Sequence, residues 1–479
     1  ETGKVIRQEL GDIGIKTLCI GQAGENLVRF ACPVSNGDHI PGRTGTGAVM
    51  GSKNLKAIAV RGSNSVRVAA PEKCKQIAKE WYRRIYEHPN FGWFSQIGTS
   101  WLVKHGNESN TRSFLNGQEQ QWPEEKVAPM YGEIFVPKYG YSDVSCFGCP
   151  THCKGFCFIN EGRYAGTYGK RPEGGGGLDG VATVCGICDY PFAQKVTNLA
   201  NQYGMDTVSL GTIAVAMELY QRGIITKEDC DGLELEWGDE DVVIEMIHKI
   251  ANREGFGDVL AEGALRAARK IGRGAEKYVE HVKGIGMFSS RRPQSKGFAL
   301  AVSTSPRGMD HLRGIPVGWW EETDRKEYDL RLIEDMVFSQ YVFASCNLLE
   351  LCPFNNYMFI NLGKTVIGLI LEVLSATTGV NFTEERLHQA CDRVNNLERA
   401  YIVREGIRRE DDMPPLRYSW QPISTGQEKG FHLDREEYGK ILNLFYEQKG
   451  WDRRTGIPTR DKLEELGLTY VADDLEKLT

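Results

Sequence analysis

The stretch SCFGCPTHCKG, residues 145–155, places three cysteines on one short segment that also contains glycine and proline. Cys146, Cys149 and Cys153 follow the spacing C-x₂-C-x₃-C, so three thiolates can converge on one point. Iron–sulfur clusters are held by cysteine thiolates at such spacings, often with a fourth ligand from far along the chain. A zinc ion is the alternative to an iron–sulfur cluster, although structural zinc sites normally present two separated ligand pairs. The stretch therefore favours a cluster loop, and a fold that brings a distant cysteine to it.

The other cysteines divide into close neighbours and isolated residues. The chain has 13 cysteines in 479 residues, and an odd count in a chain of this size favours cofactor ligation over a disulfide framework. Cys157 follows the loop closely, and pairs occur at Cys185 with Cys188 and at Cys346 with Cys352. Five more cysteines are isolated and are expected to be buried, inert thiols: Cys19, Cys32, Cys74, Cys230 and Cys391.

Composition narrows the class of protein. With 41% hydrophobic and 25% charged residues, the chain fits a soluble globular protein of two or three domains. The formal charge of −6 has both signs interspersed, which indicates neither nucleic acid nor an anionic membrane as a partner. No apolar run approaches the roughly 18 residues that a membrane span needs. We expect a small diffusible substrate or a redox partner.

The order of patterns along the chain predicts an α+β protein that is mostly α. Residues 1–65 are β-rich, with strands expected at KTLCIG, LVRFACPV and LKAIAVRG after a strand-like opening. Residues 66–283 form a helical region that carries the cluster loop, and residues 284–479 form a second helical region. Helices are expected at 71–88, 190–203, 207–222, 240–253, 257–271, 326–350 and 363–379. The loose segment from Cys146 to Asp189 is long enough to be a functional loop.

A glycine-rich loop, PGRTGTGAVMGSK at residues 41–53, has the chemistry of a phosphate site. Its glycines leave backbone N–H groups approachable, and its two basic side chains offer positive charge. The candidate residues are Gly42, Arg43, Gly45, Gly47 and Lys53. Farther along, the segments NQYGMD at 201–206 and NLLELC at 347–352 share the frame Asn-x-x-(Gly/Glu)-apolar-(Asp/Cys).

Several long segments together resemble the aldehyde:ferredoxin oxidoreductase family. Residues 23–62 resemble its glycine-rich pterin-contacting stretch, 98–117 the entry to its helical region, and 403–415 with 450–468 its carboxy-terminal signature. The resemblance implies two helical domains that clamp a tungsten or molybdenum bis-pterin centre, with magnesium bridging the pterin phosphates. It also implies a 4Fe-4S cluster. Because the glycine-rich loop comes so early, we expect an amino-terminal part of the first domain to be missing.

The resemblance also assigns roles to the two related segments. In the family, an Asp-x-x-Gly-Leu-Cys motif supplies the fourth cluster ligand, which falls here on Cys352, with Cys346 as the runner-up and Cys157 as a further competitor. Asn347 and Asn201 stand where the family has pterin-binding aspartates, and Asp206 closes the second copy. An asparagine carbonyl can accept the same N–H groups but brings no charge.

Two catalytic candidates follow from the same resemblance. The segment STSPRGMDHLRG, 303–314, places His311 at the family's histidine beside the metal, where it would move a proton. The family's catalytic glutamate segment departs most: here Pro172 and Glu173 are followed by glycines, and the nearest carboxylate is Asp179. Cys185 or Cys188 could instead place a thiolate on the metal, as in the related tungsten subunit of benzoyl-CoA reductases, although a structural pair is the plainer interpretation.

The function that the resemblance implies is oxidation of a small aldehyde to a carboxylate in the cytoplasm of an anaerobe. Electrons would leave through the cluster to ferredoxin or an iron–sulfur subunit, and a homodimer is a further expectation. Two alternatives stay open: the catalytic subunit of a low-potential thioester reductase of the benzoyl-CoA type, and a non-catalytic electron-transfer subunit.

Overall fold

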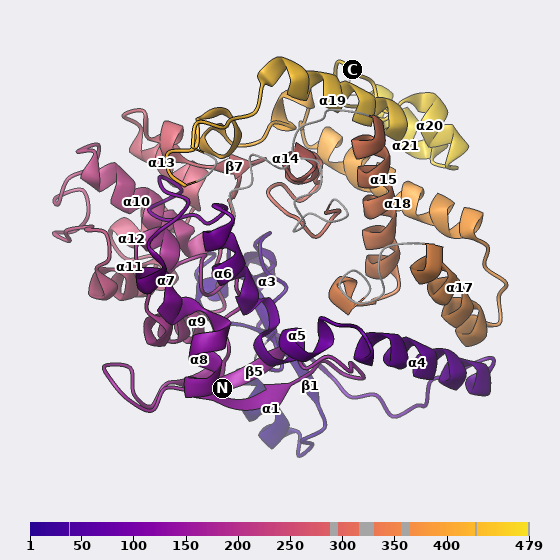
Figure 1. Cartoon of the computed structure of the whole chain (residues 1–479), viewed down its shortest axis with the longest axis horizontal. Coiled ribbons are helices and arrows are strands. Elements are labelled where there is room, and N and C mark those ends of the chain that lie inside the picture. Colours follow the sequence, from indigo (N-terminus) through magenta and orange to yellow (C-terminus); the bar gives the residue numbers. More distant parts are fainter. Residues whose placement is uncertain (38, 288–295, 316–329, 356–363, 427–428, 478–479) are drawn as a thin grey trace.

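The computed structural model describes the chain from residue 1 to 477 except residues 38, 288–295, 316–329, 356–363 and 427–428. The protein is mostly helical, with three small antiparallel sheets (Figure 1). Within the part described, no helix is both long enough and apolar enough to cross a membrane. The fold therefore agrees with the predicted mostly α class.

The amino-terminal region holds a three-stranded sheet in the order β2-β1-β3. Both neighbours run antiparallel to β1, with Leu18 opposite Ser35 on one side and Ile58 on the other. The opening segment is a helix rather than a strand, and Lys4, Arg7, Gln8 and Glu9 are residues that favour helix. The elements are α1 (Thr2–Glu9), β1 (Lys16–Ile20), α2 (Gln22–Glu25), β2 (Pro33–Ser35), α3 (Thr46–Ser52) and β3 (Ala57–Val60).

The predicted strand at 27–34 is mostly not a strand. Leu27 has a left-handed backbone with φ 57°, which ends the extended run, and only Pro33–Ser35 pairs with β1. An isolated bridge joins Ala31 to Met205 instead. This bridge ties the β-rich region to the end of a helix in the next region.

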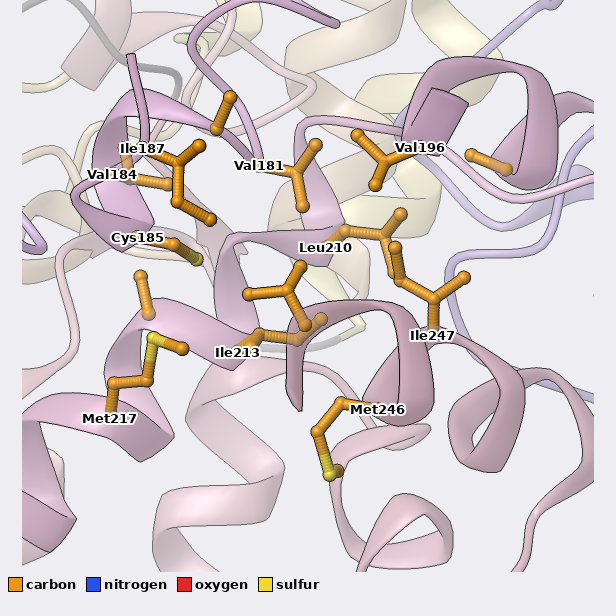
Figure 2. Packing of buried hydrophobic residues seen from close by; sticks show 14 of the residues in the cluster. Val181, Val184, Cys185, Ile187, Val196, Leu210, Ile213, Met217, Met246 and Ile247 are labelled. Atoms are coloured by element: carbon orange, nitrogen blue, oxygen red, sulfur yellow. The ribbon is translucent and has the colours of Figure 1, made fainter. Parts of the chain in front are cut away.

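Residues 98–279 build the first core with the segment 23–31 (Figure 2). Helix α9 begins where the Asp189 carboxylate accepts from the Phe192 N–H at 2.7 Å and ends at Gly204, which is left-handed. The elements are η1 (Gly98–Ser100), α6 (Trp101–Glu108), α7 (Glu124–Val127), η2 (Ala128–Met130), α8 (Gly132–Tyr139), β4 (Gly140–Val144), β5 (Lys154–Phe158), β6 (Tyr168–Lys170), η3 (Thr183–Cys185), α9 (Tyr190–Tyr203), η4 (Ser209–Gly211), α10 (Thr212–Gln221), α11 (Glu240–Asn252), α12 (Phe256–Leu260), α13 (Ala264–Ile271) and η5 (Ala275–Tyr278).

The later residues form two further cores and a small carboxy-terminal cluster. The predicted helix at 326–350 is seen from Leu330 onward, and residues 326–329 lie outside the described part. The elements are β7 (His281–Val282), β8 (Ile285–Gly286), α14 (Lys296–Thr304), α15 (Leu330–Leu348), α17 (Lys364–Thr378), α18 (Glu384–Arg404), η6 (Arg409–Asp411), the π-helical turn η7 (Leu416–Trp420), α19 (Arg435–Lys449), α20 (Arg460–Glu465) and α21 (Thr469–Glu476).

The helical region predicted at residues 66–283 does not pack as one unit, because its first two helices join a core with later residues. Helices α4 (Pro71–Tyr86) and α5 (Phe91–Ile97) contribute Ile77, Ile85 and Phe94 to a core whose other members lie between 341 and 391. Figure 1 shows α4 beside α17, and the hydrogen bond from the Ala70 N–H to the Ala376 carbonyl joins the two segments at 2.8 Å. We call this shared apolar cluster the third core.

Candidate functional site

The cysteine loop connects β4 to β5 and meets the segment that follows Cys352. The side chain of Asn355 donates to the Cys149 Sγ at 3.2 Å and accepts from the Thr151 hydroxyl at 2.8 Å. The Thr151 N–H lies 3.4 Å from the same sulfur. Two stretches about two hundred residues apart in the chain are thus joined at one sulfur atom.

The four cysteines expected to share a cluster lie near enough to perturb one another. Burial raises the pKa of the Cys153 thiol to about 12, and the thiols of Cys352, Cys149 and Cys146 raise it further. Burial also raises the pKa of Cys352, to which Cys149 and Cys146 add. Thiols that resist ionisation next to one another need a positive centre between them to become thiolates.

The four cysteines offer thiolate sulfur, which is the donor that iron–sulfur clusters use. Across the residues that the structure describes, no group of three or more His, Cys, Asp or Glu side chains is arranged to hold a single metal ion. A shared cluster at Cys146, Cys149, Cys153 and Cys352 stays a prediction.

The cysteines that were alternative ligand candidates lie in the apolar cores. Cys157 is buried on β5 beside Tyr190, which hydrogen-bonds its thiol, and Cys346 is fully buried in the third core. Cys185 is fully buried in the first core and Cys188 packs against it. Burial raises the pKa of both thiols, that of Cys188 to about 12. These positions fit structural thiols.

The two related segments form the same helix-ending turn. In NQYGMD, Gly204 has φ 71° and the Met205 N–H donates to the Ala200 carbonyl at 2.9 Å. In NLLELC, Glu350 has φ 54° and the Leu351 N–H donates to the Cys346 carbonyl at 2.8 Å. Both turns have the six-to-one hydrogen bond of a Schellman motif. Asp206 and Cys352 consequently occupy equivalent positions after α9 and α15.

Arg43 is the centre of a second convergence. Its guanidinium is buried and donates to the carbonyls of Gly286 and, at 3.1 Å, Met309. Nη1 lies 3.9 Å from the Asp206 carboxylate and has no hydrogen-bond partner in the described part of the chain. Burial lowers the pKa of Arg43, which Asp206 partly offsets. An unpaired, buried cationic donor fits an anionic group such as a phosphate.

The loop that carries His311 is fastened to the glycine-rich loop. Arg307 donates to the Gly42 carbonyl at 3.2 Å, and Arg43 holds Met309, two residues before His311. His311 is half-buried. The structure thereby brings Gly42, Arg43 and Asp206 together and joins the segment that precedes His311 to them.

Other members of the predicted phosphate loop have structural roles. A Cβ at Gly45 would meet the Arg29 carbonyl oxygen at 2.1 Å, and one at Gly47 would meet the Cys32 nitrogen at 2.6 Å. The Gly47 N–H already donates to the Ala31 carbonyl at 2.9 Å. These two glycines let α3 pack closely. Lys53 is exposed at the far end of α3, about 10 Å from the loop at 1.5 Å per residue, so it does not join Arg43.

The two asparagines expected to contact the pterin, Asn201 and Asn347, differ in solvent exposure. Asn201 is half-buried in the last turn of α9, and its carbonyl accepts from the Gly204 N–H. Asn347 is exposed at the end of α15 and lines a cavity of about 210 Å³. Arg313 and Glu398 line the same cavity and form an ion pair at 3.3 Å. Asn347 therefore lies close to the loop of His311.

Asp179 is fully buried and forms an ion pair with buried Arg112. Its other oxygen accepts from the Thr183 hydroxyl at 3.4 Å. A carboxylate held in this way has its charge neutralised and no exposed surface. This pairing holds the glycine-rich stretch to Arg112, and the catalytic role expected for Asp179 stays a prediction.

A charged group that sequence reasoning missed lies beside the cluster loop. Lys154, which follows Cys153, contacts the His39 ring, and Lys170 pairs with the exposed Glu173 at 3.1 Å. Lys170, and after it Lys154 and His39, lower the pKa of the Glu173 carboxyl. The position of Lys154 directly after a ligand candidate was the available signal. His39 carried none, because it comes from the β-rich region.

Comparison with known proteins places this arrangement in a class. Residues 76–468 match the sequence model "Aldehyde ferredoxin oxidoreductase, domains 2 & 3", and residues 1–62 match the model of that family's N-terminal domain. The chain is one of the oxidoreductases. It belongs to the aldehyde ferredoxin oxidoreductase family.

Several known proteins are similar in sequence to this chain over most of its length. A tungsten-containing aldehyde ferredoxin oxidoreductase of Pyrococcus abyssi is 33% identical over 98% of this chain and 76% of its own length. The WOR-like subunit of an aliphatic sulfonate oxidoreductase of Pyrococcus furiosus is 32% identical over 96% of this chain and 71% of its own. A chain of the active site complex BamBC of benzoyl coenzyme A reductase, in complex with 1,5-dienoyl-CoA, shares the fold with a TM-score of 0.83 at 23% identity. That match covers 99% of this chain and 77% of the other.

Proposed function

We propose that this chain is a catalytic oxidoreductase that oxidises an aldehyde and water to a carboxylic acid, two protons and two electrons. A tungsten or molybdenum bis-pterin would accept the two electrons and a 4Fe-4S cluster would pass them on singly. The observation that carries the proposal is the hydrogen-bonded junction of the cysteine loop with the Cys352 segment. That junction would place four thiolates around one cluster, with Cys146, Cys149 and Cys153 from the loop.

The residues around Arg43 would hold the pterin. Its Nη1, which has no hydrogen-bond partner among the described residues, would donate to a phosphate oxygen, and a bound magnesium ion would offset the remaining charge of the phosphates. Gly42 would leave room for that approach, because a Cβ there would lie 2.8 Å from the Asp206 carboxylate. Asn347 and Asn201 would accept hydrogen bonds from the pterin rings without adding charge.

His311 would handle the proton of the reaction. One of its ring nitrogens would take the proton released as water adds to the aldehyde carbon, and its half-buried position limits competing water. The contact of Arg43 with Met309 and that of Arg307 with Gly42, both just before His311 in the chain, would hold its loop in place. Ferredoxin or an iron–sulfur subunit would take the electrons, and we place the protein in the cytoplasm of an anaerobe because exposed iron–sulfur and reduced metal centres are oxygen-sensitive.

Elemental analysis with an activity assay tests this proposal. The anaerobically purified protein should contain tungsten or molybdenum together with about four irons, and should reduce a viologen dye when an aldehyde is added. Iron without the heavier metal, and no aldehyde-dependent dye reduction, would support an electron-transfer subunit in its place.

A thioester reductase is the second candidate, and one observation favours it. Glu173 is followed by four glycines, and Asp179, the next carboxylate along the chain, is paired with Arg112. The site consequently lacks the second glutamate that the resemblance leads one to expect. Dye-linked assays with an aromatic thioester and an aldehyde on the same preparation would separate the two candidates.

A further inference from the structure

The outer surface of the cysteine loop presents an aromatic side chain to solvent. Cys146 is exposed, and the Phe147 ring beside it is fully exposed. Cys149 and Cys153 are half-buried, so Cys146 marks the side of the loop that is nearest to solvent, and Cys352 is exposed as well. A single exposed ring is ordinary, whereas a contiguous group of exposed apolar rings marks a protein-binding surface, so the neighbours of Phe147 matter.

Helix α4 extends this surface on one side. The Tyr82 hydroxyl donates to the Gly148 carbonyl in the loop, and the rings of Tyr82 and Tyr86 meet edge to face at 6.4 Å. Tyr82 is 39% exposed and Tyr86 is 51% exposed. Lys79 and Lys75 lie one and two turns before Tyr82 on the same helix face, and both are exposed.

Basic residues outnumber acidic ones on this helix, and three of the basic side chains pair with nearby glutamates. Five basic residues and two acidic ones lie between Pro71 and Tyr86. The whole chain, in contrast, has a formal charge of −6. The helix is therefore a local basic region on an acidic protein, and it lies against the cluster loop. Such a region attracts an acidic partner and orients it.

The sheet on the other side of the loop adds further exposed rings. Tyr168 stacks on Phe156 at 5.3 Å and meets Tyr141 edge to face at 5.6 Å. Tyr141 is 70% exposed and Tyr168 is 50% exposed. The loop thus lies between a basic helix with two tyrosines and an aromatic sheet face, which is enough surface for a small and transient contact.

We propose that the surface formed by Phe147, Tyr82, Tyr86, Lys79 and Lys75 docks a small acidic iron–sulfur protein of the ferredoxin type. The inference rests on the proposed function, because it requires a cluster held by the loop. Each docking event would move one electron from that cluster to one oxidised partner cluster. Two equivalents of oxidised partner are therefore consumed for each aldehyde, and the two protons go to solvent.

The test compares two electron acceptors on the holoenzyme. In Lys79→Glu, the KM for an acidic bacterial-type ferredoxin should rise roughly tenfold at low salt, because attraction becomes repulsion, and the difference should shrink as salt increases. Phe147→Ser should raise the same KM with little dependence on salt. Aldehyde-dependent reduction of a viologen dye, which needs no docking, should keep its wild-type rate and iron content in both variants.

Lys440→Glu is the matched control, because Lys440 is an exposed helical lysine on α19, at the opposite end of the molecule from α4 (Figure 1). This variant should leave the KM for ferredoxin unchanged. Wild-type ferredoxin kinetics in both Lys79→Glu and Phe147→Ser, with normal dye activity, would overturn the docking surface while leaving the proposed function intact. A change from dimer to monomer in Phe147→Ser with unaltered ferredoxin kinetics would identify the surface as a contact between copies, which also overturns the proposal. Absence of dye activity in the wild-type holoenzyme would overturn the proposed function and the docking surface together.

Discussion

Cys352 differs from the other late cysteines in its contacts with the loop thiols. We expect Cys352→Ser to lower the iron content and abolish the magnetic resonance signal of the reduced cluster, because a serine oxygen replaces one thiolate. Cys391→Ser is the control, since Cys391 is buried beside the Ser345 hydroxyl at 3.3 Å, away from the loop. Full iron in Cys352→Ser, with loss in Cys346→Ser, would reassign the ligand.

Contacts of Arg43 and Arg307 fix the loop that carries His311. We expect His311→Ala to lower turnover by roughly 10²–10⁴-fold, the usual contribution of a positioned general acid or base. Metal analysis of the same preparation decides the interpretation. If tungsten or molybdenum leaves together with the activity, the residue belongs to the cofactor site and has no separate role in proton transfer.

Glu398 offers a pH test of the cavity beside that loop. Burial raises its pKa above the usual value, and Arg313 partly offsets the rise. A raised carboxyl pKa contributes stability when the group is protonated, and this contribution is lost as pH rises from the unfolded value near 4.5 through the folded value. The free energy of unfolding of Glu398→Gln, measured relative to wild type, should therefore increase across that window and then become constant. A pH-independent difference would contradict this account.

At the scale of elements, local patterns predicted the cysteine loop, α9 and α17 because spacing and capping act over a few residues. They could not show contacts with distant parts of the chain. Gly45 and Gly47 let α3 approach the chain at Arg29 and Cys32, and their role in a phosphate site stays a prediction. The exposed position of Lys53 follows from the helical geometry of α3, which the sequence analysis had treated as a loop.

The repeated helix-ending turn gives a prediction at this scale. Glu350 takes the left-handed conformation that glycine takes at position 204, and a side chain there costs about 1 kcal/mol. Glu350→Gly should therefore raise the free energy of unfolding by up to about 1 kcal/mol, measured by denaturant titration. Glu372→Gly, an exposed position inside α17, should lower it by about 1 kcal/mol. Loss of stability in both variants would show that the strain at Glu350 is offset elsewhere.

At the scale of the whole molecule, Asp412 joins segments that are far apart in the sequence. Its buried carboxylate contacts Lys283 at 2.7 Å, Arg399 at 2.8 Å and the Tyr446 hydroxyl. Asp412→Ala leaves two buried cations without their partner, so we expect a loss of about 3–5 kcal/mol in the free energy of unfolding. Asp474→Ala, which removes an exposed pair with Lys477, should change stability by less than about 1 kcal/mol.

The organisation into regions was only partly predictable. Composition separated a β-rich beginning from a helical remainder, because strands and helices differ in local pattern. Composition could not show that α4 packs on α17 in the third core. Both helices have enough apolar surface to join either the first or the third core. The choice depends on which faces meet in three dimensions.

The third core has a consequence for how the protein is made. Ile77 and Phe94 can be buried only after residues 341–391 have been synthesised, and Cys153 packs against the same core. A ribosome delivers the chain at about 5–20 residues per second, so the early helices are exposed during most of synthesis. With the four ligands proposed above, iron can be inserted only after Cys352 has been synthesised. A stalled or truncated nascent chain that ends before Cys352 would carry the three-cysteine loop without its fourth ligand, and we expect such chains to depend on chaperones until release.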